Sequence, residues 1–255
     1  MNREMLHKKV QEVYVEEGIT GITRRVIAKC FWYFYSPFAN MKQLAKRHGT
    51  DKGATYHTFN GINYLDLYEQ HFKAFKYKHI KLLEIGVYGG ASLRMWKEYF
   101  ANGRIYGLDI DPACKQYEED RISIEIGSQA DERVLEKLCE NCGELDIVID
   151  DGSHVNKHIL ASFKYLVGKL KPGGIYVIED LGCSYALDED YVRQKWPGMK
   201  YNNPDERLIN NRDELNKVFE EIIYDLDHFQ GEILSIQFWN NICFIVKAPF
   251  SEPRK

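Results

Sequence analysis

From residue 79 onward, short apolar runs alternate with segments of helical period. The runs lie at residues 80–86, 104–110, 122–127, 145–151 and 175–181. Strands that alternate with helices predict an open, mostly parallel sheet with helices on both faces. The last apolar stretch is interrupted at Asn240–Asn241, a plausible hairpin turn. We therefore expect a Rossmann-like α/β fold whose seven-stranded sheet ends in an antiparallel hairpin.

Two segments precede this alternation. Residues 1–40 are predicted to be a helical and aromatic segment, and residues 41–78 to be a helical lid with a central polar loop. Residues 79–255 would form the main domain. Basic and aromatic side chains mix in residues 23–38, so this stretch is expected either to pack on protein, including a second copy in a homo-oligomer, or to lie on a membrane surface.

Charge and cysteine usage limit the partners. The net charge of −4 offers no basic field for a phosphate backbone, so no nucleic acid partner is expected. No apolar run approaches the roughly 20 residues that span a bilayer. Six cysteines are scattered through a chain without a secretory signal, which favours a reduced, cytoplasmic location, peripheral to the membrane if residues 23–38 bind one.

A glycine turn follows the first predicted strand. It contains Gly86, Gly89 and Gly90, and the second strand ends nineteen residues later at Asp109. Ligands of open α/β sheets bind at the carboxyl ends of strands, where such a carboxylate can accept hydrogen bonds from ribose hydroxyls. The spacing is not that of a dinucleotide fingerprint, so no pyrophosphate cradle is expected.

Carboxylates crowd the ends of the next two strands. Asp150 and Asp151 end the fourth strand, and Glu179 and Asp180 follow the fifth. Four carboxylates at adjacent strand ends repel one another unless a cation lies among them. Oxygen ligands suit Mg²⁺, Mn²⁺ or Ca²⁺ better than zinc, so we expect a divalent metal site.

Two motifs carry a family resemblance, which covers residues 80 to about 247. The E-x-G-x-x-x-G turn that starts at Glu84 resembles the first motif of class I S-adenosylmethionine-dependent methyltransferases. The D-D-G-S-H turn, with an E-D pair 28 residues after Asp151, is similar to that of the metal-dependent sugar O-methyltransferases of the mycinamicin and tylosin group. The resemblance implies S-adenosylmethionine, a divalent ion (Mg²⁺ first, Mn²⁺ second) and methyl transfer to a sugar hydroxyl. The sugar would belong to a nucleotide sugar, such as a uronic acid, a glycan or a glycosylated metabolite.

The resemblance also implies roles for individual residues. His154 would be the general base, and the metal ligands would be Asp151, Glu179 and Asp180. Residues expected around the cofactor are Glu84, Gly86, Gly90, Ser92, Asp109, Gln129 and Asp150. Two alternatives stay open from the residues themselves: Glu84 as a structural anchor of the turn, and Gln129 as a helix cap.

Acceptor contacts are expected from two loops. A T-D-K-G segment followed by aromatic and histidine residues precedes the core in similar proteins; here it supplies Lys52, Tyr56, His57 and Tyr64. The loop after the fifth strand supplies Tyr185, Arg193 and Arg207. A catechol-type O-methyltransferase acting on an aromatic diol, and a catalytically silent cofactor-binding scaffold, are the alternative functions.

Overall fold

The computed structural model describes residues 39–185, 210 and 212–249. Contacts divide the chain into residues 1–40 and 41–255, and the second unit carries the sheet. The contact predicted for residues 23–38 lies outside the described residues, as do Arg193 and Arg207. The division into residues 1–40, 41–78 and 79–255 stays a prediction.

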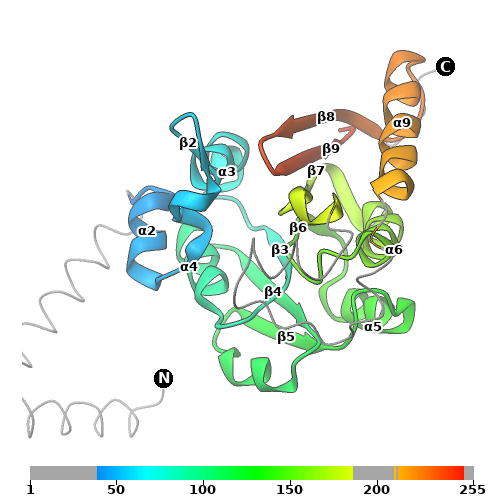
Figure 1. Cartoon of the computed structure of the whole chain (residues 1–255). Coiled ribbons are helices and arrows are strands. Elements are labelled where there is room, and N and C mark those ends of the chain that lie inside the picture. Colours follow the sequence, from blue (N-terminus) through cyan, green and yellow to red (C-terminus); the bar gives the residue numbers. More distant parts are fainter. Residues whose placement is uncertain (1–38, 186–209, 211, 250–255) are drawn as a thin grey trace, which may run out of the picture. The chain divides into compact units, whose positions relative to one another are not determined.

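The core of this unit is a seven-stranded sheet with the order β5–β4–β3–β6–β7–β9–β8 (Figure 1). β3 to β7 are mutually parallel, whereas β9 pairs antiparallel with β7 and with β8. The strands are β3 (Lys81–Ile85), β4 (Arg104–Asp109), β5 (Ile122–Ile126), β6 (Leu145–Asp150), β7 (Leu170–Ile178), β8 (Ile233–Trp239) and β9 (Ile242–Lys247). The predicted fold class, including the terminal hairpin, is confirmed.

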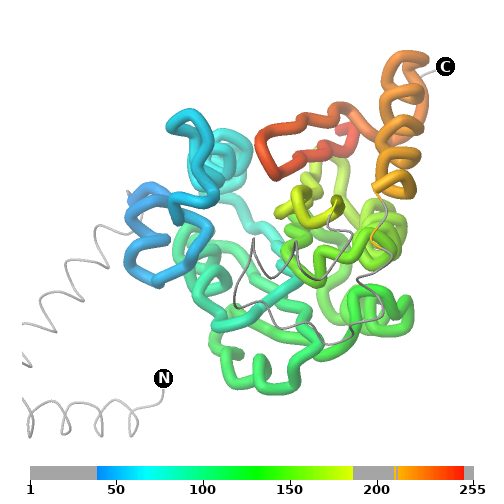
Figure 2. The backbone as a smooth tube through the Cα atoms, viewed as in Figure 1, coloured from blue at the N-terminus to red at the C-terminus, as the bar shows by residue number. Residues whose placement is uncertain are grey.

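Helices cover both faces of the sheet (Figures 1 and 2). One side carries α2 (Met41–His48), α3 (Tyr64–Phe72) and α4 (Ala91–Tyr99); the other carries α5 (Glu132–Cys142), α6 (Asn156–Leu166) and α9 (Arg212–Asp227). Between α2 and α3 lie a short hairpin, β1 (Thr58–Phe59) and β2 (Ile62–Asn63), and two 3₁₀ turns, η2 (Asp51–Gly53) and η3 (Thr55–His57). The remaining 3₁₀ turns are η4 (Lys73–Phe75), η5 (Pro112–Tyr117), η6 (Val167–Lys169) and η7 (Leu181–Tyr185).

The two faces of the sheet have different cores. Towards α3 and α4 the core is aromatic: the Tyr68 ring centroid lies 5.0 Å from that of Phe72 and 5.1 Å from that of Trp96. Towards α5, α6 and α9 it is largely aliphatic. These aromatic contacts join α3 to α4, and α2 packs against α4 as well. The segment of residues 41–78 is therefore held on this face of the sheet.

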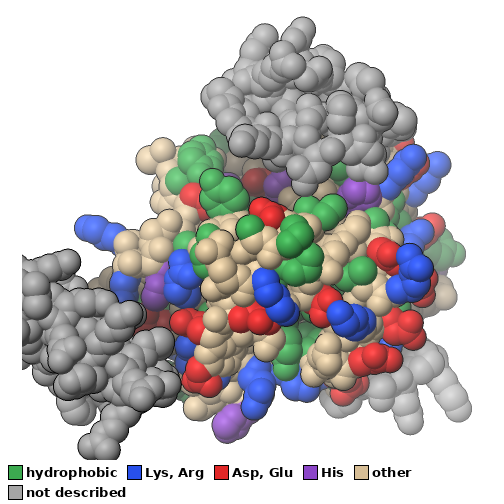
Figure 3. All heavy atoms as spheres, turned by 90° about the horizontal axis from the view of Figure 1, so that it is seen from below, with side chains coloured by type: hydrophobic (Ala, Val, Ile, Leu, Met, Phe, Trp, Pro, Cys, Tyr) green, Lys and Arg blue, Asp and Glu red, His purple; other side chains and the backbone are tan. Residues whose placement is uncertain are grey.

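On the face shown in Figure 3, acidic and basic side chains are interspersed with hydrophobic ones. Within the described part of the chain, no helix is both long and apolar enough to cross a membrane.

Strand order determines where a site can form. The chain leaves β3 for β4 and β5 and then returns to pair β6 against the other edge of β3. Such a reversal opens a crevice at the carboxyl ends of the strands. The glycine turn after β3, Asp109 at the end of β4, and the carboxylates at the ends of β6 and β7 all lie at that edge.

Candidate metal and cofactor site

Two groups of metal-ligating side chains meet where β3, β6 and β7 end. In the inner group, Glu84, Asp151 and Glu179 each offer an oxygen, all within 4.8 Å of one another. The outer group of Asp151, His154 and Asp180 satisfies the same limit. Asp151 belongs to both groups, whereas the predicted ligands Glu179 and Asp180 are split between them.

The ammonium of Lys52 lies within the inner group. Lys52 reaches it from η2, and its Nζ lies 2.6 Å from Asp151 Oδ2, 2.6 Å from Glu179 Oε1 and 3.2 Å from Glu84 Oε1. The residue is only 2% exposed. Burial alone would lower the pKa of Lys52, but the three carboxylates raise it well above its usual range, so the ammonium is charged. Lys52 contacts the carboxylates in this structure, and its predicted contact with the acceptor stays a prediction.

Burial dominates the electrostatics of the inner carboxylates. It raises the pKa of Glu179 well above its ordinary value, helped by the nearby charge of Asp151 and opposed by Lys52 and Tyr68. The Tyr68 hydroxyl donates to Glu179 Oε1. Burial also raises the pKa of Glu84, whose Oε2 accepts a 2.6 Å hydrogen bond from the Ser92 hydroxyl. Both Glu84 oxygens thus contact protein groups, and its cofactor role stays a prediction.

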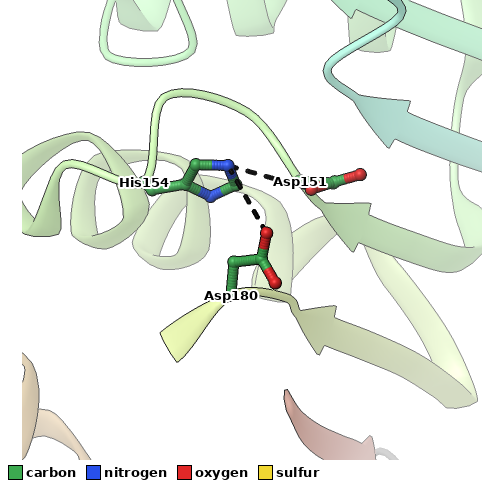
Figure 4. A group of neighbouring side chains, drawn as sticks. All are labelled: Asp151, His154 and Asp180. Atoms are coloured by element: carbon green, nitrogen blue, oxygen red, sulfur yellow. Dashed lines mark ion pairs between the residues drawn. The ribbon is translucent and has the colours of Figure 1, made fainter. Parts of the chain in front are cut away.

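The outer group is more open. Figure 4 shows the His154 ring facing Asp151 and Asp180; Nε2 lies 3.9 Å from Asp151 Oδ1 and 4.0 Å from Asp180 Oδ2. His154 and Asp180 have positive φ values of 56° and 53°. Residues other than glycine adopt this region at some cost and do so often at functional sites. Asp180 Oδ1 accepts hydrogen bonds from the Tyr64 hydroxyl, at 3.1 Å, and Asn241 Nδ2, at 2.8 Å.

One pattern unites the three predicted metal ligands. Each has one oxygen bound by the protein: Asp151 through Lys52, Glu179 through Lys52 and Tyr68, and Asp180 through Tyr64 and Asn241. Among the described residues, none donates a hydrogen bond to the second oxygen of any of them. Three carboxylates, each with one oxygen held by protein donors and the other available as a ligand, fit a hard divalent cation such as Mg²⁺ or Mn²⁺.

The glycine turn packs tightly against the backbone of Asp151. Gly86 has φ +93°, and a Cβ there would lie 2.1 Å from the Asp151 carbonyl oxygen, so only glycine fits. Asp109 Oδ2 accepts hydrogen bonds from the amides of Val87, at 2.7 Å, and Tyr88, at 3.1 Å. Asp109 therefore braces the turn in this structure, and its predicted contact with a ribose stays untested.

Gly90 lies at the N-terminus of α4. Its φ is +67°, and a Cβ would meet the Tyr117 ring at 2.9 Å, which again favours glycine. Gly90 is the N-cap of this helix and supplies no side-chain hydrogen bond to its first amides. Nothing lies within 4 Å of a Cβ built on Gly89, and Tyr88 is 94% exposed. The turn thus presents its outer edge to open space.

Asp150 and Gln129 form a buried network. Gln129 Nε2 donates to Asp150 Oδ1 at 2.9 Å, and the Ser162 and Tyr176 hydroxyls donate to Asp150 Oδ2 at 2.6 and 3.0 Å. Burial raises the pKa of Asp150 despite these donors. The alternative of Gln129 as a helix cap is wrong, because the Asp131 side chain caps α5. Gln129 Oε1 instead accepts from the Ser153 amide at 2.9 Å.

The candidate acceptor residues fall into two sets. The His57 ring packs between those of Tyr56 and Tyr64, with centroids 4.4 Å away on each side and interplanar angles of 56° and 32°. Its Nδ1 lies 3.8 Å from Asp180 Oδ1. Burial lowers the pKa of His57. Tyr185 is 58% exposed, and the Arg212 guanidinium lies 5.0 Å from its ring centroid.

Several partners of the site were not predicted from the sequence. Tyr68 and Asn241 contact the metal-ligand carboxylates, and Ser162 and Tyr176 contact Asp150. Helical period places Tyr68 on the buried side of its helix, but period alone does not say which carboxylate its hydroxyl meets. Asn241 carried only a turn signal.

Comparison with known proteins places these features in a family context. Residues 83–181 match a family model described as a methyltransferase domain. The chain is 39% identical over 184 residues to demethylmacrocin O-methyltransferase of Streptomyces fradiae, which covers 69% of this chain and 42% of that protein. It is 44% identical over 160 residues to the 8-demethyl-8-α-L-rhamnosyl tetracenomycin-C 2′-O-methyltransferase of Streptomyces olivaceus, over 58% of this chain and 40% of that one.

A solved structure agrees with these relatives. The MycE methyltransferase of the mycinamycin biosynthetic pathway, in complex with Mg, SAH and mycinamycin VI, superimposes with a TM-score of 0.65 and 31% identity, over 97% of this chain and 63% of that one. The chain spans about two fifths of the length of the curated relatives it matches. Residues 83–181 therefore form a methyltransferase domain, and the chain is a homologue of sugar O-methyltransferases of the mycinamicin, tylosin and tetracenomycin type.

Proposed function

We propose that this chain is an S-adenosylmethionine-dependent and divalent-metal-dependent O-methyltransferase that acts on a sugar hydroxyl. The observation that carries the proposal is the half-anchored set of carboxylates beside His154. Protein donors hold one oxygen of Asp151, Glu179 and Asp180, while His154 Nε2 lies within about 4 Å of Asp151 Oδ1 and Asp180 Oδ2. An imidazole next to a metal site is suited to proton transfer from an acceptor held there.

Asp151 and Asp180, with Glu179 through its second oxygen, would hold the ion. Mg²⁺ or Mn²⁺ suits this donor set because the ligands are carboxylate oxygens. When bound, such an ion orients an acceptor and stabilises its negative charge. The MycE structure, which contains Mg, supports the assignment.

The cofactor would lie along the glycine turn. Gly86 and Gly90 allow close approach to the backbone, and the uncapped start of α4 offers amides to a carboxylate. Asp109 would accept a hydrogen bond from the ribose. The other residues proposed to line the cofactor site are Ser92, Glu84, Gln129 and Asp150. S-adenosylmethionine supplies an electrophilic methyl group on a positively charged sulfur.

His154 would accept the proton of the acceptor hydroxyl. As the hydroxyl oxygen forms its bond to the methyl carbon, the carbon–sulfur bond breaks, and its electron pair leaves the sulfur neutral in S-adenosylhomocysteine. The O–H proton passes to the imidazole, which returns it to solvent. Charge balances, because the positive charge of the sulfonium ends on protonated His154.

The relatives support a sugar acceptor: one is named as acting on a rhamnosyl tetracenomycin, and MycE is solved with mycinamycin VI. Tyr56, His57 and Tyr64 are proposed to form one wall of the acceptor site, because their rings pack against one another and both His57 and Tyr64 reach Asp180. Tyr185 would lie at its edge, and Arg193 and Arg207 remain candidates for an anionic sugar. A cytoplasmic location and a membrane or oligomer contact of residues 23–38 stay predictions.

Acceptor profiling tests the proposal. Purified protein with S-adenosylmethionine and Mg²⁺ would be offered nucleotide sugars, glycosides and catechols, and products read as a gain of about 14 Da, the mass that methylation adds. We expect this gain in mass on a sugar acceptor. Activity should be lost when EDTA removes the metal ion and should recover when Mg²⁺ or Mn²⁺ is added. Methylation of catechols alone would favour the aromatic-diol alternative. Titration calorimetry without binding of S-adenosylmethionine would contradict the proposal as a whole.

A further inference from the structure

We propose that Asn241, at the tip of the C-terminal hairpin, is a positioning residue for the metal site: together with Tyr64 it holds Asp180 so that Oδ2 faces the ion. The inference rests on the proposed function for the ion itself. It adds a residue from the C-terminal hairpin, about 60 positions after Asp180 in the sequence.

The hairpin tip contacts the loop of residues 180–182 through both the backbone and the side chain of Asn241. The Asn241 carbonyl oxygen accepts from the Leu181 amide at 3.0 Å and from the Tyr64 hydroxyl at 2.9 Å. Its side-chain Oδ1 accepts from the Gly182 amide at 2.5 Å, and Nδ2 donates to Asp180 Oδ1 at 2.8 Å. One asparagine thus contacts three consecutive residues of the loop that carries Asp180.

The chemistry of these partners determines the orientation of the amide. A backbone N–H can only donate and an ionised carboxylate can only accept. The oxygen of the Asn241 amide must therefore face Gly182, and its nitrogen must face Asp180. The reverse orientation would lose both hydrogen bonds, so the assignment does not depend on distinguishing the two atoms by size.

The backbone explains why such a clamp is needed. Asp180 has φ +53°, a conformation that a residue other than glycine keeps only when its surroundings hold it. Asn241 has φ +65°, which asparagine tolerates better than most residues. A side chain on Gly182 would place its Cβ 2.8 Å from Asn241 Oδ1, so glycine at 182 lets the two loops approach.

The hydrogen bonds to Asp180 Oδ1 determine which oxygen of this carboxylate is left to contact the ion. Asn241 Nδ2 donates to Asp180 Oδ1, and the Tyr64 hydroxyl shares its one proton between Asp180 Oδ1 and the Asn241 carbonyl oxygen. Asp180 Oδ2 is the oxygen that lies towards His154. Without these donors the carboxylate could turn about its Cβ–Cγ bond and offer either oxygen. Groups that orient a metal ligand in this way typically change metal affinity about 10–100-fold when they are removed.

The test is Mn²⁺ binding by the full chain, measured by titration calorimetry without acceptor. Asn241→Gly keeps the left-handed backbone and both carbonyl contacts but removes the amide. Asn60→Gly is the matched control, because Asn60 is also left-handed (φ 49°) in a hairpin turn and is exposed. We expect Mn²⁺ affinity to fall about 10–100-fold in Asn241→Gly and to stay within about twofold of wild type in Asn60→Gly.

Tyr64→Phe gives a second reading that does not alter the hairpin. It removes the other donor to Asp180 Oδ1, and Tyr99→Phe, which removes a 3.1 Å bond to Glu69 elsewhere, is its control. We expect weaker Mn²⁺ binding in Tyr64→Phe only. Unchanged Mn²⁺ affinity in Asn241→Gly or, if that variant does not fold, in Tyr64→Phe, would overturn the positioning role while leaving the proposed function intact. A wild-type chain that binds no Mn²⁺ would overturn both.

Discussion

The inner and outer groups share Asp151 but differ in what balances their charge. In the inner group, a fixed ammonium from Lys52 contacts Glu84, Asp151 and Glu179, and all four side chains except Asp151 are nearly inaccessible. In the outer group, Asp151 and Asp180 face a partly exposed imidazole at 3.9–4.0 Å. The protein therefore neutralises one half of its acidic cluster with its own cation, and we propose that the other half holds an exchangeable one.

This difference assigns separate tasks to the two groups. Buried charges are costly unless they are paired, so the inner group is expected to determine stability. The outer group has fewer internal contacts and is expected to determine metal binding and catalysis. Substitutions in the two groups should therefore separate these properties, and each prediction below tests that separation.

The largest effect is expected at His154. His154→Gln removes the base while keeping a polar side chain of similar reach, and turnover on the acceptor found by profiling should fall about 10²–10⁴-fold. Affinity for S-adenosylmethionine, measured by calorimetry, should stay near that of wild type because the glycine turn is untouched. Turnover close to wild type would remove His154 as the base.

The next largest effect is expected at Lys52. Lys52→Met leaves the buried carboxylates of Glu84 and Glu179 without their cation, and the free energy of unfolding in EDTA should fall by about 3–5 kcal/mol. Lys137→Met, which breaks an exposed pair with Glu125, is the control and should cost about 0–1 kcal/mol. Urea denaturation measures both. Equal losses in the two variants would show that the inner group does not depend on its ammonium.

Asp180→Asn should separate binding from stability. Removing a charge from the outer group should weaken Mn²⁺ binding by at least about a hundredfold. Because Asp180 makes no contact with Lys52 among the described residues, the free energy of unfolding in EDTA should change by less than about 1 kcal/mol. Calorimetry and urea denaturation of the same preparation give both values. A large loss of stability with intact metal binding would reverse the roles of the groups.

The smallest effect is expected at Tyr68. Tyr68→Phe removes the hydroxyl that donates to Glu179 Oε1, while Lys52 still contacts that oxygen. The expected cost is about 1–2 kcal/mol in the free energy of unfolding. Urea denaturation in EDTA is the measurement, with Tyr99→Phe as a matched buried tyrosine. A cost above that of Lys52→Met would mean that the hydroxyl, and not the ammonium, holds Glu179.

The sequence predicted the sheet and the elements that carry the site. The periodicity of apolar residues predicted the five parallel strands and the hairpin. It therefore also predicted that Asp109, Asp151 and Glu179 lie at one edge of the sheet. Chain contacts at long separation were not predictable. Lysines are usually exposed, and no local pattern shows that Lys52 lies against carboxylates 99 and 127 residues away.

Side-chain direction was the other limit. A carboxylate at a strand end faces either a ligand or the core, and the sequence alone does not distinguish Asp150, which faces a buried network, from Asp151, which faces the site. Residues next to each other in the chain diverge here because alternate positions on a strand point to opposite faces.

Anomalous diffraction from crystals grown with Mn²⁺ tests the central claim most directly. We expect one peak, contacted by Asp151, Asp180 and the second oxygen of Glu179, with the Lys52 ammonium still against Glu84, Asp151 Oδ2 and Glu179 Oε1. A peak among Glu84, Asp151 and Glu179 with Lys52 displaced would contradict the central claim, because the fixed cation and the metal ion would then share one site.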